Sequence, residues 1–393
     1  MGHRIPSVRE MLGELVALPS VSSVDPAGDR PNQAMIERLA GWLEGLGFAV
    51  EVLPLAARPG KANLVATLGA GEAGLALAGH TDTVPYDVGR WRHDPFRLTE
   101  SEGRLYGLGT ADMKGFLALA VAAAAAYRPR DLRAPLTVLA TADEESGMDG
   151  ARALLEAGRP PGRHAVIGEP TGLRPVRMHK GVMMEAIRLQ GRSGHSSDPR
   201  LGVNALEGMH RILSALIEWR QELAAEHRDP AFDVPEPTLN LGYIRGGDNP
   251  NRICGECELR IDLRLLPGMD IDALRAALRA RAERAIAGSG LTLRTEALFP
   301  GIPPLATPAD APVVRAAETL TGQRAQAVAF GTEGPFLDAL GTQTVVLGPG
   351  DIAQAHQPDE YLALDRIEPM LEILHGLIGA FCLEGDSRAR ETG

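Results

Sequence analysis

Short apolar segments alternate with helical segments in the first half of the chain, and this alternation limits the possible folds more than any other feature. The apolar runs predict strands, and the stretches at 113–127 and 150–157 predict helices between them. The predicted strands are Asn63–Leu68, Leu75–Ala78, Leu136–Ala142 and Ala165–Ile167. This order indicates an α/β fold with a mostly parallel sheet, in which ligand sites lie beyond the carboxyl ends of the strands. Residues 7–48, which precede the sheet, are predicted to be largely helical.

The pattern changes after Lys180. The segments that follow predict strand, helix, strand, strand, helix and strand, which is the split βαβ plan of a self-sufficient small domain. They are 182–189, 204–223, 238–244, 253–264, 270–286 and 291–298. Helix, strand and helix patterns then resume at 311–319, 343–347 and 365–381. We therefore predict a catalytic domain formed by residues 1–179 and 299–393, with a second domain inserted at 180–298.

Length and composition narrow the class of protein. The chain has 393 residues, 44% of them hydrophobic and 23% charged, which is typical of a soluble protein with two domains. The net charge of −11 argues against nucleic acid or an anionic membrane as the main partner and favours a small molecule. The longest apolar stretch, Phe116–Tyr127, is shorter than the roughly 20 residues that span a bilayer. The N-terminus lacks a signal-peptide pattern and three cysteines form no even disulfide framework, so a cytoplasmic location is expected.

Two motifs match known binding patterns without the context that those patterns require. Gly69–Gly74 fits the G-x-G-x-x-G fingerprint of dinucleotide sites, which needs a helix after the last glycine, but Leu75–Ala78 predicts a strand. Cys254 and Cys257 form a C-x-x-C motif, but residues three apart on a strand face opposite sides. We therefore predict that the two thiols diverge and share no ion. A nicotinamide-dependent oxidoreductase would depend on the glycines alone, so it is disfavoured.

Acidic and imidazole side chains occur in five loops at the ends of the predicted elements. They are His80 with Asp82, Asp112, the run Asp143–Glu145, Glu169, and His356. In an extended chain, residues two apart point to the same side, and metal-binding histidines usually donate their second ring N–H to a carboxylate. Each loop alone has a structural explanation: Asp112 before a helix could be an N-cap, and three consecutive acids usually form a solvated turn. Together, the loops of one sheet are expected to converge at a common edge.

Imidazole and carboxylate groups without thiolate suit zinc, cobalt or manganese. Two histidines with several carboxylates exceed what one tetrahedral zinc ion needs. A pair of ions about 3.5–4 Å apart, bridged by a carboxylate and a water or hydroxide, fits better. A carboxylate left off the metals could then act as the general base. Adjacent residues in an extended chain face apart, which separates Glu144 from Glu145, but the sequence alone does not assign the base to either.

These stretches carry a family resemblance. The motifs that carry it, in chain order, are Gly79–Pro85, Gly107–Gly115, Thr141–Gly147, Ile167–Thr171 and Ala355–Pro358. They resemble those of the di-zinc deacylase and aminopeptidase-like family, to which carboxypeptidase G and the aminoacylases belong, and the similarity covers nearly the whole chain. The resemblance implies a zinc-peptidase-like mixed sheet flanked by helices, with an inserted ferredoxin-like α+β domain for dimerisation or as a lid. It also implies a homodimeric hydrolase that cleaves the amide bond of an N-acyl amino acid.

The resemblance implies the metal ligands by position. His80 and Glu169 would hold one Zn²⁺, for which Co²⁺ is a plausible substitute. Glu145 and His356 would hold the other ion. Asp112 would bridge the two.

It implies further roles around the metals. Asp82 would orient His80, and Glu144 would be the base that takes a proton from the bridging water and passes it to the leaving nitrogen. His195, in the inserted domain, would stabilise the tetrahedral oxyanion, often from the partner subunit, and Arg264 would grip the substrate carboxylate in bidentate fashion. Second-rank candidates for substrate contacts are Asn251, Arg252, Gly331 and Thr332. A non-catalytic binding scaffold would have lost a ligand or the base, and every expected position is filled.

Overall fold

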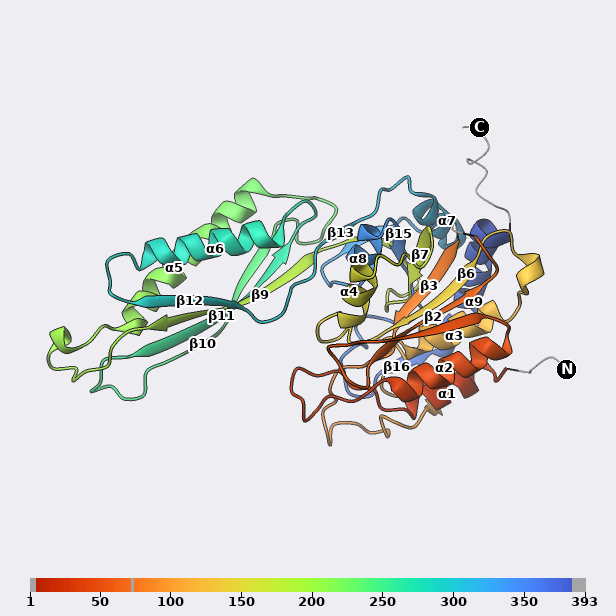
Figure 1. The fold of residues 1–393 in the computed structure, drawn as a ribbon, viewed down its shortest axis with the longest axis horizontal. Coiled ribbons are helices and arrows are strands. Elements are labelled where there is room, and N and C mark those ends of the chain that lie inside the picture. The colour runs from red at the N-terminus through yellow and green to blue at the C-terminus, as the bar shows by residue number, and fades with distance from the viewer. Residues whose placement is uncertain (1–4, 72–73, 384–393) are drawn as a thin grey trace. The chain divides into compact units, whose positions relative to one another are not determined.

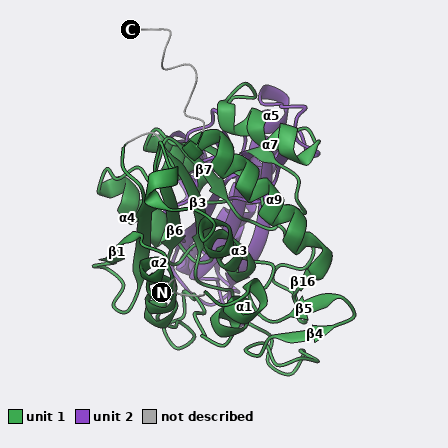
Figure 2. Ribbon diagram, turned by 90° about the vertical axis from the view of Figure 1, so that its right-hand side faces the viewer, with its two compact units in different colours: residues 1–177, 307–326, 332–393 green, residues 178–306, 327–331 purple. Residues whose placement is uncertain are grey.

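The computed structural model describes residues 5–71 and 74–383. The chain divides into two compact units, which Figure 2 shows in different colours. The first unit contains residues 1–177, 307–326 and 332–393, and the second contains residues 178–306 and 327–331. The inserted domain was predicted at 180–298. The second unit starts slightly earlier, at residue 178, ends later, at residue 306, and also includes residues 327–331.

The central sheet of the first unit is mixed (Figure 1). Its strands, in spatial order, are β1 (Ala49–Pro54), β2 (Ala62–Leu68), β6 (Leu136–Thr141), β3 (Leu75–His80), β7 (His164–Ile167), β15 (Gln343–Val346), β8 (Val176–His179) and β13 (Leu305–Ala306), with β14 (Gln326–Val328) beside β8. The four strands β6, β3, β7 and β15 are parallel, and the pairs on either side of them are antiparallel. The expectation of a mostly parallel sheet therefore holds only for its centre. The connection of residues 55–61 between β1 and β2 is too short for a crossover, so these strands must be antiparallel.

Helices cover this sheet. They are α1 (Val8–Val16), α2 (Gln33–Gly45), α3 (Lys114–Ala124), α4 (Asp149–Glu156), α7 (Pro312–Thr321), α8 (Gly334–Ala339) and α9 (Ile367–Ile378). α3 packs on β3 and β6 and is contacted by α1 and α9, which buries almost all of its apolar residues. Among the described residues, no helix is long and apolar enough to cross a membrane. A small separate sheet contains β16 (Tyr361–Ala363), β5 (Arg104–Tyr106) and β4 (Thr99–Ser101).

The N-terminal segment is less helical than predicted. Residues 17–32 form no helix and separate α1 from α2. Pro19 and Pro26 explain the interruption, because a proline inside a helix removes a backbone donor and clashes with the preceding turn. α1 itself begins at a capping box, in which the Ser7 hydroxyl accepts from the backbone of Glu10 and the Glu10 carboxylate accepts from the backbone of Ser7.

The second unit has the predicted strand and helix order. Its elements are β9 (Gly181–Gln190), α5 (Ala205–Glu226), β10 (Thr238–Gly246), β11 (Glu256–Leu265), α6 (Ile271–Ala285) and β12 (Thr292–Ala297). The antiparallel sheet has the order β10-β11-β9-β12, which is the ferredoxin-like arrangement. α5 and α6 lie on one face of this sheet and share its apolar core (Figure 1). Alternate residues of β11 turn into that core, so Arg260, Asp262 and Arg264 lie on the opposite face.

The glycine motif at 69–74 and the C-x-x-C motif at 254–257 lie in structural parts of the two units. β3 begins at Leu75, so a strand follows the Gly69–Gly74 stretch as predicted; residues 72 and 73 lie outside the described part of the chain. The premise that Cys254 and Cys257 share one strand was wrong, because β11 begins only at Glu256. Both cysteines are buried in the core of the second unit, and the thiol of Cys254 donates to the carbonyl oxygen of Glu256 at 3.0 Å.

Candidate metal centre

The predicted ligands converge at one edge of the central sheet because parallel strands deliver their loops to the same side. His80 is the last residue of β3, Glu145 follows β6, and Glu169 follows β7. His356 lies in the long loop between β15 and β16. Asp112 comes from the loop before α3, where the peptide bond between Asp112 and Met113 is cis. The predicted ligands thus lie in loops that meet at one edge of the sheet in the first unit.

Asp112 lies between the two histidines. Its Oδ1 is 3.1 Å from Nε2 of His80, and its Oδ2 is 3.4 Å from Nε2 of His356. Nε2 of His356 is also 3.1 Å from a carboxylate oxygen of Glu145. Ligand atoms of His80, Asp112 and Glu145 all lie within 4.8 Å of one another, and among the described residues this is the only group that could hold a metal ion in this way. A carboxylate whose two oxygens face two different imidazoles has the arrangement of a bridging ligand.

The ring of His80 is oriented to present a lone pair to this cluster. Nδ1 lies 3.0 Å from the main-chain carbonyl oxygen of Asp82, which can only accept, so Nδ1 carries the proton. In a neutral ring Nε2 is then an acceptor that faces a carboxylate oxygen of Asp112. Two facing acceptors need a cation or a proton between them. Atoms bound about 2.0–2.1 Å from one tetrahedral zinc ion lie roughly 3.3 Å apart, close to the 3.1 Å between Nε2 of His80 and Oδ1 of Asp112.

Asp82 contacts the His80 ring through its main chain. Its carboxylate is 3.7 Å from Nδ1 of His80, beyond hydrogen-bond distance, so its main-chain carbonyl orients the ring instead. The carboxylate oxygens accept from the backbone N–H groups of Glu144 at 3.2 Å and Glu145 at 3.1 Å. The Asp82 side chain therefore holds the loop that carries the candidate base and a candidate ligand.

Glu169 has a buried carboxylate oxygen without a hydrogen-bond partner. Oε1 makes no hydrogen bond and lies 3.9 Å from Nε2 of His80, and the residue is only 6% exposed. Burial, reinforced by the charge of Asp112, raises the pKa of Glu169 well above its ordinary value. Buried acceptors are almost always satisfied, so this oxygen is suited to a cation as its partner.

The two adjacent glutamates have different surroundings. Glu145 contacts His356 and belongs to the metal-binding group, whereas Glu144 does not belong to it. Burial, followed by the charge of Glu169, raises the pKa of Glu144 well above its ordinary value. His356 is half exposed, and its hydrogen bonds to Asp112 and Glu145 raise its pKa to about 10. The geometry thus favours Glu145 over its neighbour Glu144 as a metal ligand, because Glu145 lies with His80 and Asp112.

The candidates in the second unit form a group of their own. Residue His195 forms a β-bridge with Arg252, and the N–H of Ser196 donates to the carbonyl of Asn251 at 3.1 Å. Nδ1 of His195 accepts from the backbone N–H of Ser197 at 3.2 Å, which leaves the proton of a neutral ring on Nε2. The ring is exposed and can donate from that atom.

Two further candidates have protein partners. Arg264 forms an ion pair with Asp262 at 3.0 Å. Thr332 belongs to the first unit, is fully buried, and accepts from the backbone of Gly334. Gly331 lies in the second unit, at the boundary.

Sequence reasoning missed several buried charges around the loop that follows β6. Lys61 is 3% exposed and donates to Asp143 at 2.6 Å and to Asp29 at 2.9 Å. Asp143 has a positive φ of 58°, so this ion pair fixes an unfavourable conformation directly before Glu144. Glu333, next to the candidate Thr332, is buried and accepts from the Thr141 hydroxyl at 2.8 Å, and burial raises its pKa to about 7. Only its position in the Phe330–Gly334 stretch could have signalled it.

Residues 76–380 match the family model described as peptidase family M20/M25/M40. The chain belongs to this family. Among curated relatives, the acetylornithine deacetylase of Proteus mirabilis (strain HI4320) is 50% identical over 385 residues, which cover 98% of this chain and 99% of the relative. That of Edwardsiella ictaluri (strain 93-146) is 50% identical over 384 residues, covering 97% and 100%.

Solved structures of M20 proteins share the fold. A metallo-carboxypeptidase of the M20 family from Sulfolobus solfataricus superposes with a TM-score of 0.74 at 18% identity, covering 96% of this chain and 99% of the other. A Bacillus subtilis protein described as a dinuclear metal-binding peptidase of the M20 family gives 0.67 at 16% identity, covering 96% and 98%. The mixed α/β architecture is therefore the M20 fold, and the chain is a hydrolase of amide bonds.

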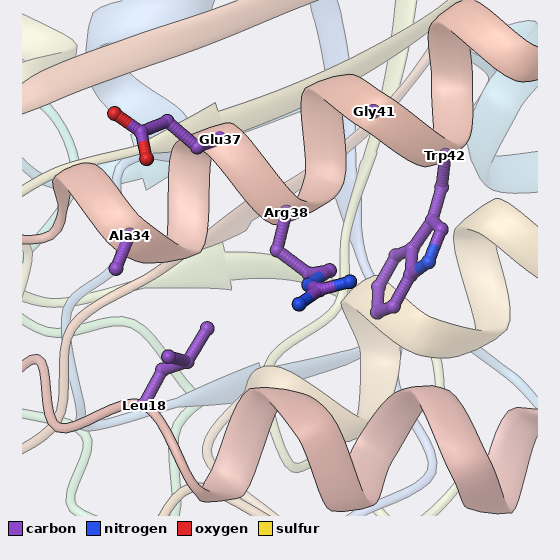
Figure 3. Close-up of a pocket in the computed structure, with 6 residues that line it drawn as sticks. All are labelled: Leu18, Ala34, Glu37, Arg38, Gly41 and Trp42. Atoms are coloured by element: carbon purple, nitrogen blue, oxygen red, sulfur yellow. The ribbon is translucent and has the colours of Figure 1, made fainter.

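A separate hollow of about 510 Å³ lies beside α2 (Figure 3). None of the candidate metal ligands lines it. It is lined by Leu18, Ala34, Glu37, Arg38, Gly41 and Trp42. Five of these residues come from α2, and Arg38 forms an ion pair with Glu14 of α1 at 3.2 Å. The hollow holds no histidine and no group of carboxylates, so it lacks the chemistry for amide hydrolysis.

Proposed function

We propose that this M20 chain is an acetylornithine deacetylase, which hydrolyses N2-acetyl-L-ornithine to L-ornithine and acetate in cytoplasmic arginine biosynthesis. The observation that carries the chemistry is Asp112, whose two oxygens face His80 and His356. The substrate is supported by curated relatives of that name at 50% identity over nearly the whole chain. Other deacylations, such as that of succinyl-diaminopimelate or of N-acetylated amino acids in general, are the alternatives.

Five segments also resemble acetylornithine deacetylase more than its relatives. Four of them, 91–96, 175–181, 251–254 and 266–269, contain no proposed metal ligand, and the fifth, 354–362, surrounds His356. The pair Phe330-Gly331 departs from the expected pattern before Thr332 and Glu333. A change at residues near the substrate side chain bears on the choice of substrate and leaves the hydrolytic chemistry unaffected.

Two metal ions fit the ligands of the first unit. His80 and Glu169 would hold one ion, Glu145 and His356 the other, and Asp112 would bridge them. Zinc suits this set of imidazoles and carboxylates, and cobalt would be a functional substitute. When bound, such a pair supplies a polarised acyl carbonyl and a water of lowered pKa. Glu169 supports this assignment because its buried Oε1 has no hydrogen-bond partner and lies 3.9 Å from Nε2 of His80.

The chain's own residues would move the proton and stabilise charge. The carboxylate of Glu144 removes a proton from the attacking water as the carbon–oxygen bond forms, and delivers it to the nitrogen as the carbon–nitrogen bond breaks. Acetate and the free amine are then the products, and the base is regenerated. The Nε2–H of His195 is available to donate to the oxyanion, because Ser197 occupies Nδ1. Arg264 would exchange part of its pairing with Asp262 for the substrate carboxylate.

A side-by-side substrate assay tests the proposed function. We expect acetylornithine to be hydrolysed with a higher kcat/KM than acetylmethionine or succinyl-diaminopimelate, because the curated relatives that cover the whole chain carry that name. Released amine is measured for each substrate at equal enzyme and metal concentrations, with the Glu144→Gln variant as the background. Preference for succinyl-diaminopimelate would make the chain a desuccinylase, and no hydrolysis of any of the three would refute the deacylase assignment.

We expect a homodimer that forms through the second unit. His195 belongs to that unit and the metal ligands to the first, and β10 is an edge strand on which Ile244 is 52% exposed. An exposed apolar edge is a template for pairing with a second copy. Sedimentation should show dimers at assay concentration, and Ile244→Arg should shift them towards monomers and lower activity. Val24→Arg, at a site that is 81% exposed in the first unit, is the matched control. A fully active wild-type monomer would contradict the proposal.

A further inference from the structure

A buried carboxylate outside the predicted ligand set holds the loop that carries Asp112. Glu360 is only 2% exposed. Its Oε2 accepts from the N–H of Gly109 at 2.9 Å, and its Oε1 accepts from Ala111 at 2.7 Å and from Asp112 at 3.0 Å. Its main-chain carbonyl accepts from Gly107 at 3.0 Å. One residue thus satisfies four backbone donors of the loop between β5 and α3.

That loop needs an external acceptor. It contains neither strand nor helix, and Gly109 adopts a positive φ of 83°, so its N–H groups have no regular ladder to join. Buried backbone N–H groups without partners are costly. A carboxylate suits this task because both of its oxygens accept and neither donates. A glutamine at the same place would point its NH₂ group at one set of these donors.

Glu360 also lies in the segment that supplies His356. The two residues are four positions apart, in the loop that leads into β16. The Glu360 carboxylate therefore joins the loop of Asp112 to the segment of His356. These are the two groups whose atoms Oδ2 and Nε2 lie 3.4 Å apart in the candidate metal centre. Any shift of one loop against the other would change that separation.

We propose that Glu360 is a positioning residue that sets the spacing between Asp112 and His356. Asp112 would bridge both ions, but only His356 shares the segment of Glu360, so Glu360 governs affinity for the ion held by Glu145 and His356 more than for the ion held by His80 and Glu169. This inference rests on the proposed two-metal site. Partners of metal ligands are typically worth about 10–100-fold in metal affinity. A residue that only stabilised the fold would lower the melting temperature without separating the two ions.

The test compares Glu360→Gln with Asp359→Asn in the full-length protein. Asp359 is the matched control because it is the neighbouring carboxylate and also accepts backbone donors, from Arg92 at 2.8 Å and His93 at 3.2 Å. Its partners precede β4 and do not belong to the loop of Asp112. Zn²⁺ binding to each metal-stripped variant is measured by calorimetry, together with melting temperature and kcat at increasing free Zn²⁺.

For Glu360→Gln we expect one ion to bind as in the wild type and the other about tenfold or more weaker. Its kcat should recover when free Zn²⁺ is raised. Asp359→Asn should bind both ions normally, whatever its melting temperature. If Glu360→Gln does not fold, Glu360→Asp, which keeps both acceptor oxygens on a shorter stem, should show the same selective weakening.

Other outcomes would overturn the inference. If a folded Glu360→Gln or Glu360→Asp protein binds both ions with wild-type affinity, the positioning role is refuted. The proposed deacetylase function would still stand. Equal weakening of both ions, or the same defect in Asp359→Asn, would also refute it, because the effect would then be general. A wild-type protein that hydrolyses acetylornithine with a single ion would refute the two-site basis of the inference alone.

Discussion

Replacing Glu144 by glutamine is expected to remove nearly all deacetylase activity while both metal ions stay bound. The amide keeps the size of the side chain but cannot accept the proton of the attacking water. The loss of a general base typically costs about 10²–10⁴-fold in rate. Metal should be retained because Glu144 lies outside the ligand set that we propose and outside the group formed by His80, Asp112 and Glu145. The measurement is kcat for acetylornithine, with the zinc content of the same sample determined by mass spectrometry.

Glu145→Gln is the matched control, because it makes the same chemical change at the next residue. Glu145 contacts Nε2 of His356 at 3.1 Å, so its variant should lose metal along with activity. The backbone N–H groups of both residues are held by Asp82, which makes the two positions comparable in their anchoring. An active Glu144→Gln protein, or one that loses metal as Glu145→Gln does, would show that the roles of the two glutamates are assigned wrongly.

Local patterns were sufficient to predict most elements of the fold. The second unit is the clearest case, because α5 and α6 keep their apolar residues at helical spacing and β11 alternates buried and exposed residues. These periods depend on residues close in sequence. The convergence of His80, Asp112 and Glu145 was also predictable, since parallel strands bring their carboxyl ends to one edge.

Features set by distant contacts could not be predicted. Lys61 meets Asp143 across 82 positions, and Glu360 meets the backbone of Asp112 across 248. Nothing in either local sequence distinguishes these residues from surface charges. The direction of β2 and the start of β11 at Glu256 were missed for a related reason, because apolar runs locate a strand but fix neither its direction nor its end. Asp82 is a similar case. Its position two residues after His80 predicted that the two residues lie close together, but it did not predict that the main-chain carbonyl of Asp82 makes the contact.

Removing the metals is expected to abolish activity and to lower the melting temperature. The carboxylates of Asp112, Glu145 and Glu169 would remain crowded around His80 without a cation, and Glu169 would keep an unsatisfied buried oxygen. A ligand at 100 times its dissociation constant stabilises the folded state by about 2.7 kcal/mol. For a domain of this size, each kcal/mol corresponds to about 2–4 °C, so losing one ion should lower the melting temperature by roughly 5–10 °C. The measurement is thermal unfolding before and after dialysis against a chelator.

Metal add-back and histidine variants test whether the loss of activity and melting temperature comes from the proposed metal site. Added Zn²⁺ or Co²⁺ should return both activity and melting temperature, whereas Mg²⁺, which prefers an octahedral shell of oxygen ligands, should not. His356→Ala should lose much of the response to the chelator, because it removes the imidazole next to Asp112 and Glu145. His210→Ala, at an exposed histidine of α5, should keep the full response. If chelation changes neither activity nor melting temperature, the convergence of these side chains has a cause other than metal binding.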